Sequence, residues 1–359
     1  MDKNLRGNPF KHIYVPDPKQ IFEKAIKRAR MISIPKIKDK FTQHKVLLIN
    51  RINTMRQVIL SNFSNLLREF PNINSLHEFY RAILNVFSTT DICKKQLGRI
   101  QGVIRVIEKL SERYRENIRK IHKTKYITEK DALKHIWRLW KQYVARVSDI
   151  IEEVSDAFLY IKELLKKLKK LPDYDPTLPC VVTTGPPNSG KSSFVAKVSN
   201  AKVQIASYPF TTKDIVFGHI EFKNEPIPLV VQIVDTPGLF DRPIHMRKKE
   251  ELLALEAIRT IADAVVFLFD GSTERVLEAN EQLSIYETVK NFFKNSSRII
   301  ICINKIDIKD DTLINKLTNH IEKHEKKIPL LISVKTCEGL DEVLKQIYSI
   351  VKTCVKNAH

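Results

Sequence analysis

The residues best suited to chemistry lie in segment 185–192, which reads G-x-x-x-x-G-K-S. An apolar run typical of a buried strand, residues 180–184, precedes this segment, and residues 194–198 resemble the start of a helix. Glycines let backbone N–H groups approach an anion, and the N-terminus of a following helix adds partial positive charge. The pattern in this context therefore predicts a phosphate-binding loop. Its predicted binding residues are Pro187, Asn188, Ser189, Gly190, Lys191, Ser192 and Ser193.

A second candidate begins where another apolar run ends, because Asp235 opens a D-T-P-G sequence. Its carboxylate would hold Mg²⁺ through water, and the N–H of Gly238 would contact a γ-phosphate, which Lys191 would also reach. Segment 208–212, between this motif and the loop, contains two threonines, one of which should bind Mg²⁺ and the γ-phosphate. We favour Thr212 over Thr211 for this role. The predicted metal ligands are Ser192, Thr212 and Asp235.

A third motif specifies the base. Residues 304–307 read N-K-x-D after an apolar run. A buried Asp307 can accept hydrogen bonds from the N1–H and 2-amino groups of guanine, whereas adenine offers neither donor and would leave the carboxylate unpaired. The stem of Lys305 would pack over the base. Segment 333–335 is a weaker match to a loop that contacts the guanine oxygen through backbone N–H groups. The predicted base-binding residues are Asn304, Lys305, Asp307, Ser333, Val334 and Lys335.

Composition places these motifs in an ordinary globular chain, with 43% hydrophobic and 28% charged residues among 359, a length typical of about two domains. No apolar run approaches the roughly 20 residues of a membrane span, and residues 1–6 lack the apolar core of a signal peptide. We therefore expect a cytoplasmic protein. Five singly placed cysteines favour buried thiols over zinc or disulfides.

The net charge of +20 is unevenly distributed. Residues 1–170 contain 37 Lys and Arg against 17 Asp and Glu, whereas residues 171–359 contain 24 of each class. The whole excess therefore belongs to the first half, which indicates a polyanionic partner, most simply RNA. An anionic membrane surface is the rival partner, and a merely solvated basic face is the third interpretation.

Hydrophobic periodicity separates the two halves. Helical spacing recurs from residue 19 to about 30, and then over about 36–69, 75–86, 90–122 and 128–170. Segment 171–179, with three prolines, ends the helices. Apolar runs then predict strands at 180–184, 216–222, 229–234, 264–269, 298–303 and 329–333, of which the second and third should form an antiparallel hairpin at a sheet edge.

The predicted fold class is therefore α plus α/β. Residues 1–170 form a basic antiparallel bundle of long helices for RNA docking, 171–179 a linker, and 180–359 a Ras-like P-loop domain with a mostly parallel six-stranded sheet and helices on both faces. We expect the aromatic side chains of the bundle to be core residues rather than base-stacking platforms. These are Phe63, Phe70, Phe79, Tyr80, Trp137, Trp140 and Tyr143.

The wording of the motifs resembles one family. The sequences G-x-P-N-x-G-K-S-S, Y-P-F-T-T-K and D-T-P-G-L-F-D-R-P are similar to those of the Obg–HflX superfamily and, within it, the Nog subfamily of GTPases. The first half is similar too, although between about 85 and 165 only the helical pattern supports the likeness. The resemblance implies GTP binding and hydrolysis with Mg²⁺, and a role in assembly of the large ribosomal subunit through ribosomal RNA. The chain ends at His359 without the long extension of eukaryotic members, so we expect an archaeal member. Separately, we expect a monomer.

Two positions concern hydrolysis. Leu239 occupies the place where Ras-like enzymes carry a water-orienting glutamine, so we expect slow intrinsic hydrolysis. Asn188 occupies the position that coordinates K⁺ in cation-dependent relatives, and the alternative is that it only shapes the loop. We interpret His245 and Arg247 as part of a charged loop. Ser189 occupies a position where valine is usual, and we expect the serine to be tolerated. The predicted catalytic residues are Lys191, Thr212, Gly238 and Asn188.

Two other functions remain open from the sequence. A tRNA- or translation-directed GTPase would share the switch motifs but dock on a different RNA. A nucleotide-gated scaffold would use the helical half to recruit proteins, with hydrolysis incidental. Salt-sensitive binding to ribosomal RNA separates the scaffold from the RNA-docking functions.

Overall fold

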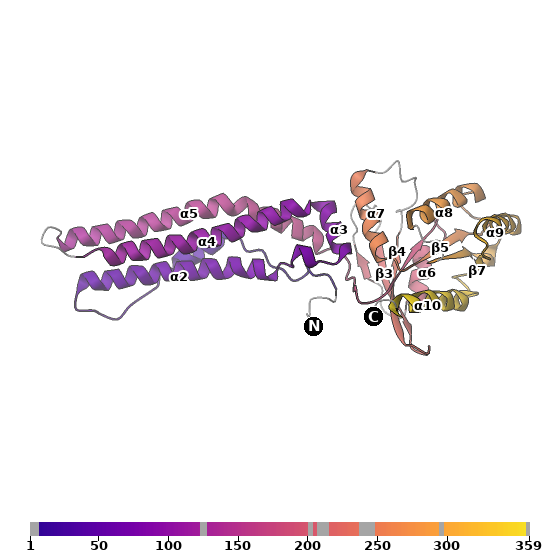
Figure 1. Ribbon diagram of the computed structural model, residues 1–359, viewed down its shortest axis with the longest axis horizontal. Helices are drawn as coiled ribbons and strands as arrows, with labels where there is room; N and C mark the ends of the chain where they lie inside the picture. Colours follow the sequence, from indigo (N-terminus) through magenta and orange to yellow (C-terminus); the bar gives the residue numbers. More distant parts are fainter. Residues whose placement is uncertain are drawn as a thin grey trace. The chain divides into compact units, whose positions relative to one another are not determined.

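The computed structural model describes residues 7–122, 128–199, 204–206, 215–236, 248–293 and 298–356 (Figure 1). The chain divides into two compact units. We call Phe10–Ser75 together with Ser88–Leu168 the helical unit. The sheet unit consists of Met1–Pro9, Leu76–Phe87 and Lys169–His359.

The helical unit contains four of the predicted helices. Their bounds are α1 Pro18–Arg30, α2 Lys40–Glu69, α4 Thr90–Lys120 and α5 Glu129–Leu168, with a one-turn 3-10 helix, η2, at Ile73–Ser75. Side-chain caps set the first residues, because Asp17 accepts from the backbone N–H groups of Lys19 and Gln20, and Asp39 accepts from that of Thr42. The cap at Asp39 explains why α2 begins later than the predicted residue 36.

The three long helices, α2, α4 and α5, lie lengthwise beside one another (Figure 1). Phe63 and Phe158 join α2 to α5, with ring centroids 4.6 Å apart. Ser111 and Tyr143 join α4 to α5 through hydroxyl groups 2.9 Å apart, and burial raises the pKa of Tyr143 to about 12. The prediction of core aromatics is confirmed for six of the seven residues. Trp137 is half-buried, with the Arg51 guanidinium over its ring.

Helix α3, Glu78–Phe87, comes from the N-terminal half of the sequence but belongs to the sheet unit. It packs against α7, Lys249–Ile261. The Tyr80 hydroxyl donates to the Tyr174 carbonyl at 3.1 Å and accepts from the Tyr174 backbone N–H at 3.2 Å. Burial raises the pKa of the Tyr80 phenol far above its usual value, so the group stays a neutral donor. Residues 76–87 therefore lie outside the helical unit, although the sequence suggests one continuous helical region.

The proline-containing segment 171–179 is fixed to the sheet by one side chain. Gln232 is fully buried, accepts from the backbone N–H of Asp175 at 2.9 Å and donates to the Asp175 carbonyl at 2.8 Å and the Leu178 carbonyl at 3.3 Å. Because the amide uses both of its ends on the backbone, the segment follows a defined path beside the sheet.

The sheet has seven strands in the part of the chain that is described, in the order β2-β3-β4-β1-β5-β6-β7. The bounds are β1 Cys180–Thr184, β2 Gln204–Ala206, β3 Ile215–Phe222, β4 Leu229–Asp235, β5 Ala264–Asp270, β6 Ile299–Asn304 and β7 Leu330–Leu331. The six predicted strands are all present, β3 and β4 are antiparallel as predicted, and β1, β4, β5, β6 and β7 pair in parallel. The three-residue β2 was not predicted because it is too short to show a pattern, and it, rather than β3, occupies the edge.

Helices cover both faces of the sheet, as predicted. One face packs on α6, Lys191–Val198, and α10, Leu340–Lys356, in a single apolar cluster. On the other face Phe267 and Phe269 contact Tyr286 of α8, Ala279–Phe293, and α9, Asp311–Glu325, packs beside α8. Within the described ranges no helix has the length and apolar character needed to cross a membrane. The prediction of buried cysteines is met at three positions and fails at two, since Cys337 is exposed and Cys354 half-buried.

We expect Tyr80→Phe to destabilise the sheet unit by about 1–2 kcal/mol, because the buried Tyr174 carbonyl loses the bond from the Tyr80 hydroxyl and the Tyr174 N–H keeps only the Pro172 carbonyl. Urea unfolding of the full chain measures the change, and Tyr14→Phe, at an exposed tyrosine, is the control. Equal unfolding midpoints for the two variants would show that this pair of bonds contributes nothing.

Candidate nucleotide site

The phosphate-binding loop connects β1 to α6, and two of its glycines are required by their surroundings. Gly185 has φ +149°, and a Cβ there would lie 2.2 Å from the Leu268 carbonyl oxygen. Gly190 has φ +93°, and a Cβ there would lie 2.4 Å from Nδ2 of Asn304. The loop therefore packs tightly against the ends of β5 and β6. A side chain at either glycine would prevent this packing.

The lysine and serine of the motif occupy the first turn of α6. The Lys191 ammonium, largely buried, donates to the carbonyl of Gly185 at 3.0 Å and that of Pro186 at 2.6 Å. The Ser192 hydroxyl donates to Oδ2 of Asp235, the last residue of β4. The structure thus brings together the serine and the carboxylate that the sequence predicts as Mg²⁺ ligands. Hard oxygen donors of this kind fit that ion.

Asn304 connects the phosphate loop to the predicted base-binding loop. Its Nδ2 donates to the Ser189 carbonyl at 2.8 Å, and its Oδ1 accepts from the Val334 backbone N–H at 3.0 Å. The side chain is buried and both of its polar ends are paired. The first residue of N-K-x-D therefore has a structural role, holding two loops in a fixed relation.

Asp307 and Ser333 also lie together, since the serine hydroxyl donates to Oδ1 of Asp307 at 2.6 Å. The expectation of a buried Asp307 is wrong: the residue is exposed. It lies on a one-turn 3-10 helix, η5 (Ile306–Ile308), that contributes no buried residue. Ser333 and Val334 are buried, whereas Lys335 is exposed.

Asp270 was missed by the sequence analysis. It is the last residue of β5, is almost fully buried, and holds the Lys305 ammonium at 2.7 Å through Oδ2. Its Oδ1 accepts from the backbone N–H and the hydroxyl of Ser272. The available signal was the same as for Asp235, namely an apolar strand that ends in aspartate. Asp270 orients the lysine that we expect to pack over the base.

Two loop residues depart from the expected pattern. Asn188 is exposed and has φ +60°, a left-handed conformation that asparagine tolerates better than most residues. The left-handed backbone at this position is part of the shape of the loop. Ser189 is fully buried, and its hydroxyl has no hydrogen-bond partner among the described residues. Of the remaining loop positions, Pro187 is half-buried and Ser193 is exposed.

Several predicted residues lie outside the described ranges. They are Thr211, Thr212, Gly238, Leu239, His245 and Arg247. Within the described part of the chain, His, Cys, Asp and Glu side chains form no group of three or more suited to a metal. The assembled portion of the site thus consists of the phosphate loop, Asp235, Asp270, the N-K-x-D segment and the 333–335 loop.

Comparison with known proteins agrees with this geometry. Residues 10–175 match the family described as the NOG1 N-terminal helical domain, and residues 180–305 match that described as 50S ribosome-binding GTPase. An uncharacterized protein of Methanocaldococcus jannaschii is 32% identical over 316 residues, which cover 85% of this chain and 83% of that protein. This chain belongs to the Nog family of GTPases. Membership implies that it binds GTP.

Other Nog-family members differ in length. Nucleolar GTP-binding protein 1 of Arabidopsis thaliana is 30% identical over 84% of this chain but only 46% of its own length. A crystal structure of nucleolar GTP-binding protein 1 from Plasmodium falciparum has 28% identity and a TM-score of 0.43, and covers 52% of this chain and 93% of that one. The chain thus spans most of the M. jannaschii protein and less than half of the Arabidopsis protein.

We expect Asp270→Asn to weaken GDP binding about five- to tenfold, because Lys305 loses the carboxylate that orients it. Equilibrium titration with a fluorescent GDP derivative measures the affinity. The matched control is Asp311→Asn, which removes an exposed carboxylate 2.9 Å from Lys309 outside the site. A loss of the same size in both variants would contradict a specific role for Asp270.

Proposed function

We propose that this Nog-family chain is a GTP-hydrolysing switch in assembly of the large ribosomal subunit, and that its basic helical half docks on ribosomal RNA. The observation that carries the proposal is the link through Asn304. A single buried amide joins the phosphate loop to the loop expected to contact guanine. The same chain also has a helical half, and that half carries the entire excess of positive charge.

The phosphates would bind at the first turn of α6. There Lys191 would exchange its two loop carbonyls for phosphate oxygens, and backbone N–H groups from Asn188 to Ser193 would donate to the same anion. Ser192 and Asp235, together with Thr212, would hold Mg²⁺, which neutralises phosphate charge when bound. The direct bond between Ser192 and Asp235 supports this assignment.

Guanine specificity would come from Asp307. Its exposed carboxylate is available to two donors of the base, while Ser333 fixes its orientation. Lys305, held by Asp270, would cover one face of the base. The backbone N–H groups of the 333–335 loop would approach the guanine oxygen.

Hydrolysis would be slow in the isolated protein because Leu239 cannot orient a water molecule. Gly238 would contact the γ-phosphate, and Thr212 would bind that phosphate. An activating group on the ribosomal particle would supply the missing water-positioning function, which would make hydrolysis report on correct docking.

The partner is supported by the descriptions of the two matched families and by the charge distribution. The test is binding of the full chain to isolated large subunits, in a GTP analogue or in GDP, over a salt series. Tight binding that is favoured by the GTP analogue and falls steeply with salt is the expected result.

Other outcomes would replace the proposal. Equal, weak binding in both nucleotide states would remove the ribosome as partner. Binding to free tRNA in preference to large subunits would favour a translation-directed GTPase. Salt-insensitive binding that survives removal of RNA would favour a protein scaffold.

We expect K⁺ to accelerate GTP hydrolysis about tenfold or more over Na⁺, and Asn188→Gly to abolish the acceleration. Glycine deletes the candidate ligand but keeps the left-handed backbone, so the loop itself should survive. Phosphate release in the two salts measures the effect, and GDP affinity is the control for loop shape. Acceleration that persists in Asn188→Gly would assign Asn188 to loop geometry alone.

A further inference from the structure

The positive charge of the helical unit is concentrated at one end. Ser111 of α4 contacts Tyr143 of α5, and Arg56 of α2 contacts Glu108 of α4. These parts of the three helices therefore lie side by side. We call α2 residues 40–60, α4 residues 105–120 and α5 residues 129–148 the loop half, because it contains the end of α4 and the start of α5. The rest of these three helices is the opposite half.

The two halves differ sharply in composition. The loop half contains 15 Lys and Arg against 5 Asp and Glu, whereas the opposite half contains 7 of each class. The 40 residues of α5 form one continuous helix. Its first half is basic, and its second half is not. A general preference for lysine would have spread the charge along the whole helix.

One face of α5 carries the clearest arrangement. Its basic stripe consists of Lys130, Lys134, Arg138 and Lys141, all exposed. The spacings of four, four and three residues place them on one face, about 16 Å long at 1.5 Å per residue. Buried residues such as Ile136, Tyr143 and Val147 occupy the other face. Among the described residues none of the four forms an ion pair.

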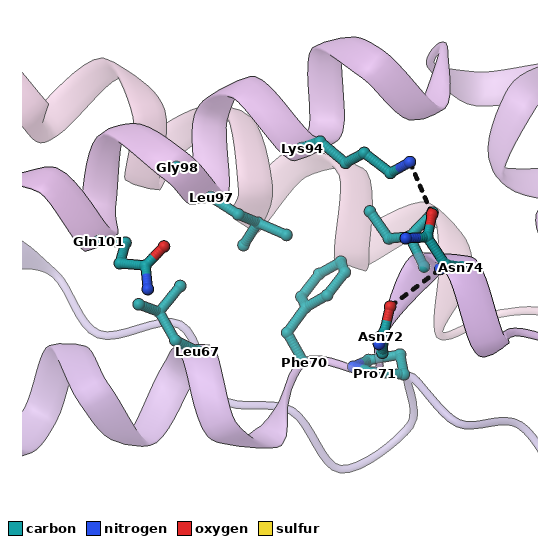
Figure 2. Close-up of a pocket in the computed structure, with 10 residues that line it drawn as sticks. Leu67, Phe70, Pro71, Asn72, Asn74, Lys94, Leu97, Gly98 and Gln101 are labelled. Carbon is teal, nitrogen blue, oxygen red and sulfur yellow. Dashed lines mark hydrogen bonds between the residues drawn. The ribbon is translucent and has the colours of Figure 1, made fainter.

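In the opposite half, acidic residues equal the basic residues in number. The Arg99 guanidinium donates to both carboxylate oxygens of Asp156, at 2.6 and 2.8 Å, and Lys19 of α1 lies 3.7 Å from Glu152. A hollow of about 430 Å³ also lies in this half, between the end of α2 and the start of α4 (Figure 2). Figure 2 shows Lys94 at its rim donating to Asn74, at 2.8 Å. The hollow and the excess of positive charge are thus at different ends of the unit.

We propose that the loop half, through the basic stripe of α5, is the surface that docks on the phosphate backbone of ribosomal RNA. The inference rests on the proposed function and adds the location and mode of contact. A convex row of separated cations suits successive phosphates. The aromatic side chains of the loop half are buried or half-buried, so binding there depends on backbone charge and shape rather than on stacked bases.

An anionic membrane fits this surface poorly. Among large apolar side chains described as exposed, only Val106 belongs to the loop half, and surface-bound helices need an apolar face or aromatic anchors. Charge alone favours either polyanion, and the lack of such anchors in the described part of the loop half favours RNA.

The test compares two charge reversals on the same helix. Lys134→Glu with Arg138→Glu alters the stripe, and Lys162→Glu with Lys166→Glu makes the same change of charge, at the same spacing of four, at exposed positions of the opposite half. The readout is binding of the full chain to a large-subunit ribosomal RNA transcript over a KCl series. We expect the stripe variant to bind at least about tenfold more weakly and to lower the log–log salt slope by about 2, and the control to stay within about threefold of the parent.

Other results would overturn the inference. Equal losses in both variants would show that only total charge matters. Unchanged binding in the stripe variant, with strong binding by the parent, would locate the RNA site elsewhere. If the parent binds neither transcript nor subunit, the proposed function itself fails. Stripe-dependent binding to phosphatidylserine vesicles without RNA binding would assign a membrane surface.

Folding is controlled within the same experiment. Both variants should keep the parent's GDP affinity and helical circular dichroism, because neither pair touches the nucleotide site. If the reversal disturbs folding, Lys134→Gln with Arg138→Gln, against Lys162→Gln with Lys166→Gln, repeats the comparison with half the change of charge. The stripe pair should again bind the transcript more weakly than its control.

Discussion

The nucleotide site depends on how one buried amide is satisfied. Asn304 donates to the carbonyl of Ser189 and accepts from the N–H of Val334. A buried amide with an unpaired end costs about 1–3 kcal/mol, so both loops are held where the amide requires them. Gly190 belongs to the same constraint, since a Cβ there would meet Nδ2 of Asn304. The phosphate loop and the base-binding segment are therefore not independent modules joined by chance.

Parallel strand pairing brings the remaining groups to the same edge. β1, β4, β5 and β6 run in parallel, so their carboxyl ends meet, and these ends carry the phosphate loop, Asp235, Asp270 and Asn304. Two carboxylates there have distinct partners. Asp235 accepts from the Ser192 hydroxyl, whereas Asp270 holds the Lys305 ammonium. One carboxylate therefore contacts the serine of the phosphate loop, and the other contacts the lysine of N-K-x-D.

The chain forms two units, but it does not divide between them at a single point. Helix α3 leaves the helical region of the sequence and packs against α7, while Tyr80 bonds both polar groups of the Tyr174 peptide. α7 follows the D-T-P-G segment along the sequence. The nucleotide-binding unit therefore includes a helix whose two ends continue directly into the helical unit.

Much of this protein was determined by local sequence. Helical spacing predicted the long helices and apolar runs predicted six strands, because both patterns are local properties of the sequence. The wording of the motifs predicted the family, and charge counting separated the halves. Tertiary structure decided the rest. Asp270 acquires its role only when β5 and β6 pair, Asp307 is exposed because η5 buries none of its residues, and α3 joins the sheet unit because its apolar face packs on α7. Each depends on contacts between residues distant in sequence, which no local pattern records.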